Sequence, residues 1–236
     1  MIYQNIRNKY EYSIIHLFQP IYNLKNNDII GYEALLRDSS GRWASPVEIF
    51  KDAEKKGCRN SLDLMSIKTA FKTFKDESRH LFVNIFPSTL LEADFLPWWD
   101  TNVPPAVPIV MELSENEPVE DWDGLKAATC KLQARGVKIA IDDMGAGYSS
   151  FRQWIELEPD FIKLDRYFAE GLSASPRKQK AVRTMVELLS DTAEIIIEGV
   201  ETEADLGIIK LLEIPYAQGF LLGRPAAWEA RRRSCF

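Results

Sequence analysis

Short apolar runs alternate with longer segments of helical periodicity along the whole chain, and this alternation constrains the fold more than any other feature. It is typical of βα units around a parallel sheet. The pattern predicts eight strands, at Ile14–Phe18, Ile29–Leu36, Leu81–Ile85, Ile109–Leu113, Val137–Ile141, Phe161–Leu164, Ile195–Ile197 and Ala217–Leu221. The clearest helices between them are Leu125–Arg135 and Arg177–Ser190. Because a (β/α)8 barrel uses about 250 residues, we expect residues 1–236 to form one α/β barrel domain.

The start of this barrel is predicted to be irregular. Only the turn Asn26-Asn27-Asp28 separates the first two strands, and it is too short for a helical crossover. These two strands are therefore expected to pair antiparallel. The expected fold is a modified TIM barrel with one antiparallel strand near the N-terminus. Gly136 follows the helix that ends at Arg135 and is expected to terminate it.

Charge and cysteine content exclude several classes of function. The chain has 29 Lys and Arg against 35 Asp and Glu, a net charge of −6, which disfavours binding to DNA, RNA or anionic membranes. No apolar run approaches the roughly 18 residues of a membrane span, and no signal-peptide core opens the chain. Three cysteines without CxxC spacing indicate reduced thiols, so we expect a cytoplasmic protein without membrane insertion.

Catalysis by this chain is expected to depend on carboxylates. With only His16 and His80 available, a zinc site or a His-based triad is hard to build. Polar residues instead interrupt or end the predicted strands: Glu33, Asn84, Glu112, Asp142, Asp143, Lys163 and Glu198. In a barrel the carboxyl ends of parallel strands open onto one face, where loops build the active site. The period of two also places Arg37 on the same strand face as Glu33.

Each of these polar residues has a simpler explanation when taken alone. Asp142 and Asp143 could cap a helix, Glu33 and Arg37 could form an edge ion pair, and Lys163 could face solvent. Taken together, five carboxylates, an amide and an ammonium at successive strand ends favour one site. Such a cluster attracts cations, and oxygen ligands favour Mg²⁺ or Mn²⁺. Five carboxylates, Lys163 and two divalent cations carry no net charge, which suits hydrolysis of a phosphate ester by two metals about 3.5–4 Å apart.

A set of ordered motifs gives these residues a family likeness. Glu33-Ala34-Leu35 lies within YEALLR and is accompanied by FQPI (18–21), VN (83–84), ELSE (112–115), DDMGAGYSS (142–150), FIKLD (161–165), EGVET (198–202) and QGFLLGRP (218–225). This set resembles the EAL domains, the cyclic di-GMP phosphodiesterases of bacteria. The likeness covers about residues 13–228. It implies a modified TIM barrel that hydrolyses cyclic di-GMP to linear 5'-pGpG with Mg²⁺ or Mn²⁺, two ions per site.

The resemblance also implies roles for individual residues. Glu33, Asn84, Glu112 and Asp142 would bind one metal, and Asp142, Asp143 and Glu198 the other. Lys163 would hold or polarise the attacking water, so that Lys163, Glu33 and Glu198 form the catalytic group. Substrate-binding positions are Gln19, Leu36, Arg37, Asp165, Glu201 and Gln218, of which Arg37 would bind phosphate or guanine. Leu36 has an equal reading as ordinary core, which strand alternation favours.

The glycine-rich loop that follows Asp143 departs from the family pattern. Glu115 matches a residue that anchors this loop in active members. Met144 replaces the usual Phe and Ala146 the usual Thr, which removes a ring and a hydroxyl that would order the loop. The alternatives are therefore a receptor that binds cyclic di-GMP without cleaving it and a protein-interaction module of the same fold. The resemblance further implies a homodimer, and a separate regulatory protein is an additional possible partner.

Overall fold

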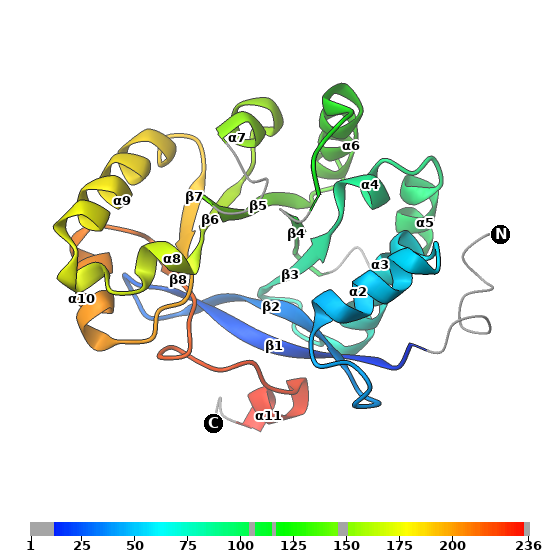
Figure 1. Cartoon of the computed structure of the whole chain (residues 1–236), viewed down its shortest axis with the longest axis horizontal. Helices are drawn as coiled ribbons and strands as arrows, with labels where there is room; N and C mark the ends of the chain where they lie inside the picture. Colours follow the sequence, from blue (N-terminus) through cyan, green and yellow to red (C-terminus); the bar gives the residue numbers. More distant parts are fainter. Residues whose placement is uncertain (1–11, 104–106, 115–116, 146–150, 234–236) are drawn as a thin grey trace.

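The computed structural model describes residues 12–103, 107–114, 117–145 and 151–233. Its strands close into an eight-stranded barrel in sequence order (Figure 1). They are β1 (Ile14–Asn23), β2 (Ile29–Asp38), β3 (His80–Ile85), β4 (Ile109–Leu113), β5 (Lys138–Met144), β6 (Phe161–Leu164), β7 (Glu194–Ile197) and β8 (Tyr216–Ala217). β1 pairs antiparallel with both β2 and β8, and all other neighbours are parallel. The predicted modified TIM barrel with one antiparallel strand is confirmed.

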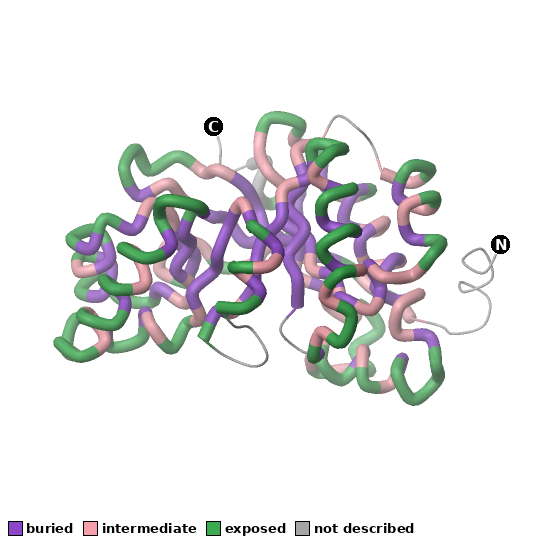
Figure 2. The backbone as a smooth tube through the Cα atoms, turned by 90° about the horizontal axis from the view of Figure 1, so that it is seen from above, coloured by how far each residue is buried: buried purple, intermediate pink, exposed green. Residues whose placement is uncertain are grey.

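Helices surround the barrel, and most lie between successive strands. They are α2 (Pro46–Lys55), α3 (Arg59–Thr73), α4 (Pro87–Leu90), α5 (Phe95–Asn102), α6 (Trp122–Gln133), α7 (Phe151–Leu157), α8 (Arg166–Ala169), α9 (Pro176–Leu189), α10 (Glu203–Leu211) and α11 (Trp228–Arg233), with a 3₁₀ turn η2 (Leu172–Ala174). Figure 2 shows buried strands at the centre and helices with exposed outer sides. None of these described helices has the length and apolar content to cross a membrane.

The barrel interior is a packed core at the amino ends of the strands. Inward-facing residues of six strands form one apolar cluster: Ile21, Phe82, Val110, Ala140, Phe161 and Ile196. Two larger clusters join the outer faces of the strands to the helices. The interior is therefore closed below by apolar side chains, and a polar site has room only at the carboxyl ends of the strands.

The last predicted strand, Ala217–Leu221, is shorter in the structure and ends at Ala217. After β8 the chain bends over the segment that follows β7, where Val200 N donates to Gln218 O at 3.1 Å and Leu221 N to Val200 O at 3.0 Å. A Cβ on Gly219 would lie 2.2 Å from the Val200 backbone, so only glycine permits this close approach. The bend leaves Gln218 at the mouth of the barrel.

Helix α6 ends at Gln133, two residues before the predicted Arg135, and Gly136 lies in the turn that follows it. Gly136 adopts φ 80°, in the left-handed region that favours glycine. Val137 N donates to Leu132 O at 3.2 Å and closes the helix end. The chain then enters β5, which carries two of the predicted site residues.

Candidate active site

Lys163 lies at the centre of a cluster of carboxylates at the barrel mouth. It projects inward from β6 and is 1% exposed. Its Nζ lies 2.7 Å from Glu198 Oε1, 2.8 Å from Glu112 Oε1 and 2.8 Å from Asp142 Oδ1. Glu33 Oε2 is a fourth neighbour at 3.5 Å. Strands β2, β4, β5 and β7 thus direct one carboxylate each toward the same ammonium, and Lys163 does not face solvent.

The two consecutive aspartates of β5 need an irregular strand. In a regular strand Asp142 and Asp143 would point to opposite faces. The β5–β6 register shifts between Ile141 and Met144, and Asp143 has φ 48°, which is uncommon for a residue other than glycine. The result is that Asp142, Asp143 and Glu198 offer oxygens that all lie within 4.8 Å of one another.

Side-chain amides orient Glu33 from both sides. Gln218 Nε2 donates to Glu33 Oε2 at 2.6 Å, and Asn84 Nδ2 approaches Glu33 Oε1 at 3.3 Å and Glu112 Oε2 at 3.1 Å. Gln19 accepts from Gln218 Nε2 at 3.2 Å and donates to Gly223 O at 3.0 Å. Glu33 is therefore held by amide donors from two parts of the barrel, Asn84 of β3 and Gln218 after β8.

Burial and mutual repulsion shift the protonation of this cluster. Burial, opposed in part by Lys163 and assisted by Glu33 and Asp142, raises the pKa of Glu112 well above its usual range. Burial and repulsion from Asp142 likewise raise the pKa of Glu198. Although burial alone lowers the pKa of Lys163, the surrounding carboxylates raise it well above its usual value. The surrounding carboxylates therefore favour the ammonium form of Lys163, whose Nζ lies within hydrogen-bond distance of three of them.

The donor set fits hard divalent cations. Five carboxylates share the mouth with one ammonium, Lys163, so negative charge exceeds positive charge in a site largely removed from water. The side-chain ligand atoms that line this space are carboxylate and amide oxygens, and the described lining residues include no cysteine and no histidine. Oxygen-rich sites of this kind suit Mg²⁺, Mn²⁺ or Ca²⁺.

The predicted substrate-binding residues take several positions around the mouth. A cavity of about 280 Å³ above the carboxylates is lined by Gln19, Asp165, Glu201 and Gln218, among others. Asp165 also caps α8, because its Oδ1 accepts from Tyr167 N at 3.0 Å. A second cavity of about 360 Å³ extends from Asp142 and Asp143 toward α2 and α3, and Arg37 lines it.

Leu36 lies on the opposite face of β2 from Glu33. It is 6% exposed and packs with Ile49 and Ala53 of α2 and Leu62 of α3, as strand alternation favours for a core residue. Its side chain nevertheless borders the larger cavity. Glu115, Ala146 and most of the glycine-rich loop lie outside the described residues, whereas Met144 is buried in the core beside β6.

The structure also adds residues to the mouth that sequence reasoning missed. Arg166 and Phe220 line the smaller cavity, and the Arg224 guanidinium lies 4.2 Å from the centre of the Phe220 ring. Arg166 Nη2 lies 3.6 Å from Glu201 Oε1. The sequence could have indicated Arg166, because it directly follows Asp165 at a strand end. It could not have indicated Phe220, because the sequence pattern assigned that residue to a strand.

Comparison with known proteins gives this geometry a family. The EAL domain model matches residues 3–225. The Escherichia coli protein PdeI, named as a probable cyclic di-GMP phosphodiesterase, is 31% identical over 249 residues, which cover 97% of this chain and 31% of PdeI. An uncharacterized protein of Mycobacterium tuberculosis is 28% identical, over 92% of this chain and 37% of that protein. The chain thus spans well under half the length of these relatives.

Solved structures agree with this match. BlrP1 of Klebsiella pneumoniae, in complex with calcium and cyclic di-GMP, superposes with a TM-score of 0.80 at 29% identity, over 90% of this chain and 56% of that one. An EAL domain protein of Listeria monocytogenes has a TM-score of 0.86 at 24% identity, over 99% of this chain and 95% of that one, which supports the fold alone. The chain belongs to the EAL domain family.

Proposed function

We propose that this chain is a metal-dependent phosphodiesterase that hydrolyses cyclic di-GMP to linear 5'-pGpG and so lowers the level of a second messenger. One observation carries the proposal: four strands direct carboxylates at one buried ammonium, with an excess of negative charge that divalent cations would neutralise. The names of PdeI and of the BlrP1 complex, which includes cyclic di-GMP, support the choice of substrate.

The metal ligands proposed for the first ion are Glu33, Asn84, Glu112 and Asp142. Asp142 would be shared with a second ion bound by Asp143 and Glu198. Mg²⁺ or Mn²⁺ bound there would supply Lewis-acid activation of the phosphodiester and of a water molecule. The convergence of Asp142, Asp143 and Glu198 within 4.8 Å and the amide contacts of Asn84 support this division.

Lys163, Glu33 and Glu198 are the proposed catalytic group. As a buried ammonium, Lys163 would donate a hydrogen bond to the attacking water and fix its orientation. Glu198, directly after the neighbouring strand β7, and Glu33, on β2 across the barrel, both face that ammonium. The water-excluding interior below strengthens each of these interactions.

The proposed contacts to the dinucleotide come from both cavities. Arg37 would bind a phosphate or a guanine edge from the larger cavity, next to Leu36. Gln19, Asp165, Glu201 and Gln218 would line the smaller one. Gln218 would act chiefly by orienting Glu33, because its Nε2 already donates to Glu33 Oε2 at 2.6 Å. Gln19 would support this role by accepting a hydrogen bond from the same Gln218 Nε2 at 3.2 Å.

We also propose a cytoplasmic homodimer with a separate regulatory protein as partner. Phe151 and Ile155 of α7 are 46% and 63% exposed, which suits burial against a second copy. This helix directly follows the glycine-rich loop, so dimer formation would bear on the ligands Asp142 and Asp143 at the start of that loop.

The proposal is tested by incubating the purified chain with cyclic di-GMP and Mn²⁺ and resolving the products by chromatography. The expected product is 5'-pGpG, and EDTA should abolish its formation. A chain that binds cyclic di-GMP, measured by calorimetry, but forms no product with either Mn²⁺ or Mg²⁺ is a receptor. A chain that does neither is an interaction module.

A further inference from the structure

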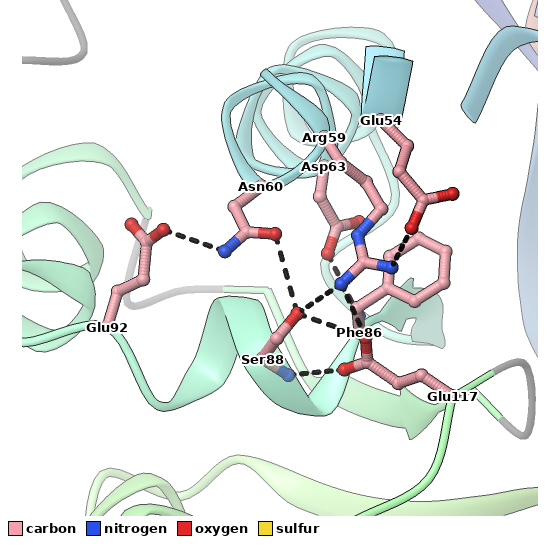
Figure 3. A network of polar contacts seen from close by, with 8 residues as sticks. All are labelled: Glu54, Arg59, Asn60, Asp63, Phe86, Ser88, Glu92 and Glu117. Carbon is pink, nitrogen blue, oxygen red and sulfur yellow. Dashed lines mark hydrogen bonds and ion pairs between the residues drawn. The ribbon is translucent and has the colours of Figure 1, made fainter. Parts of the chain in front are cut away.

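A polar network outside the carboxylate cluster is built around Arg59, the first residue of α3 (Figure 3). The Arg59 guanidinium lies 4.9 Å from the centre of the Phe86 ring. Its Nη2 donates to Ser88 Oγ at 2.9 Å and to Glu117 Oε2 at 2.5 Å. One planar side chain thus contacts the segment that follows β3 and the segment that follows β4.

Glu117 is the anionic centre of this network. It is 8% exposed, and both of its carboxylate oxygens are engaged. Oε1 accepts from Ser88 N at 2.5 Å, and Oε2 accepts from Arg59 and from Ser88 Oγ, the latter at 3.1 Å. A carboxylate at this depth is stable only with such partners, so the Arg59–Glu117 pair fixes the geometry of both segments.

The two segments joined by the pair carry candidate metal ligands. Asn84 lies four residues before Ser88, and Glu112 lies five residues before Glu117. The β3–β4 ladder ends where Ile85 faces Leu113, and one further backbone bond joins Ser114 N to Ile85 O at 3.0 Å. Beyond this point, within the described residues, the side chains of Arg59, Ser88 and Glu117 hold the two strand ends together.

The same helix supports β3 at a second point. Asp63 lies one turn after Arg59 and accepts from Phe86 N at 2.9 Å. Helix α3 therefore contacts Phe86, after Asn84, through the Asp63 hydrogen bond to its backbone N–H and through the Arg59 guanidinium on its ring. It contacts Glu117, after Glu112, through the ion pair with Arg59. Since Asn84 Nδ2 lies 3.1 Å from Glu112 Oε2, a shift of either strand end would change the distance between these two ligands.

We propose that Arg59 and Glu117 are positioning residues for the metal centre: their ion pair locks the ends of β3 and β4 together and so keeps Asn84 and Glu112 at the separation that the first ion requires. This inference rests on the proposed function, because it assigns the pair a part in metal binding. Arg59 also borders the larger cavity, so direct contact with the substrate is the competing role.

The experiment measures Mn²⁺ affinity by calorimetry, together with kcat and KM for cyclic di-GMP, in the full chain and in Arg59→Met and Glu117→Gln. Each variant is expected to bind Mn²⁺ about tenfold more weakly, as is usual when a group that orients metal ligands is lost. The double variant should bind Mn²⁺ no more weakly than either single variant, because each single substitution already removes the same ion pair. Saturating Mn²⁺ should restore kcat, with KM unchanged. If Arg59→Met does not fold, the near-isosteric Glu117→Gln carries the test.

Arg135→Met is the matched control, since Arg135 donates two bonds to Asp100, at 2.7 and 2.9 Å, far from the strand ends that carry ligands. Its Mn²⁺ affinity should equal that of the parent. Parental Mn²⁺ affinity in Arg59→Met and Glu117→Gln overturns the inference, as does a raised KM with unchanged affinity, which would assign Arg59 to the substrate. A parent chain that binds no Mn²⁺ refutes the proposed function, and the inference with it.

Discussion

Replacing Lys163 with Met removes the ammonium that lies among Glu33, Glu112, Asp142 and Glu198 and roughly keeps the side-chain volume. Lys163 is 1% exposed, and its Nζ lies 2.7–2.8 Å from three carboxylate oxygens. Removing one partner from a buried ion pair typically costs about 3–5 kcal/mol, because the remaining charge is left uncompensated. With a urea dependence of about 3 kcal/mol per M, the unfolding midpoint should fall by about 1 to 1.7 M.

Urea unfolding of the parent and of Lys163→Met, each in EDTA and in saturating Mn²⁺, measures this cost. The deficit should be largest in EDTA and should shrink by at least about half in Mn²⁺, because a ligand that binds only the folded state stabilises it and the variant site has more negative charge to neutralise. Burial and neighbouring carboxylates raise the pKa of Glu112 and of Glu198. Protonation of these two groups at lower pH relieves the repulsion among the carboxylates, so the loss of unfolding free energy in Lys163→Met should be larger at pH 8 than at pH 6. A deficit below about 1 kcal/mol in EDTA, or one that Mn²⁺ leaves unaltered, refutes this reasoning.

Three further predictions concern single side chains. Glu33→Ala should lower turnover at least about a hundredfold, because it removes a metal ligand. Turnover is measured at fixed Mn²⁺, and an unchanged rate would show that Glu33 is an ordinary strand residue and not a ligand. Burial and Arg37 lower the pKa of His16 to about 4, so the parent should lose about 2 kcal/mol of unfolding free energy relative to His16→Leu between pH 8 and pH 5; parallel pH profiles would contradict this. Burial raises the pKa of Asp63 to about 7, so the parent should instead lose about 2–3 kcal/mol relative to Asp63→Asn as the pH rises from 5 to 8. Urea unfolding at both pH values reads out this second difference, and a difference of zero would mean that Asp63 stays ionised.

The fold was largely predictable from local sequence. Parallel barrel strands are short apolar runs with helices between them, and the brief turn at Asn26-Asn27-Asp28 required the first two strands to be antiparallel. The length of β8 was not predictable from the pattern, because Gln218–Leu221 reads as a strand. A long-range contact decides it: the chain leaves the ladder to bond to Val200.

The candidate site was predictable in its residue types and not in its geometry. Single polar residues at successive strand ends mark the mouth, because a barrel gathers those ends on one face. The alternation rule by itself would separate Asp142 from Asp143, and only the register shift in β5 brings both to the mouth. The donor from Gln218 to Glu33 joins residues 185 positions apart, and the Arg59–Glu117 pair joins residues 58 positions apart. Neither pair has a local signal.

The most direct test of a two-cation hydrolytic site is to follow Mn²⁺ binding and formation of 5'-pGpG in the same titration of the chelator-treated chain with cyclic di-GMP present. The account predicts about two Mn²⁺ bound per chain, with turnover that rises only as the second ion binds. Turnover that persists in excess EDTA, or a chain saturated with about two Mn²⁺ that leaves cyclic di-GMP intact, would contradict it.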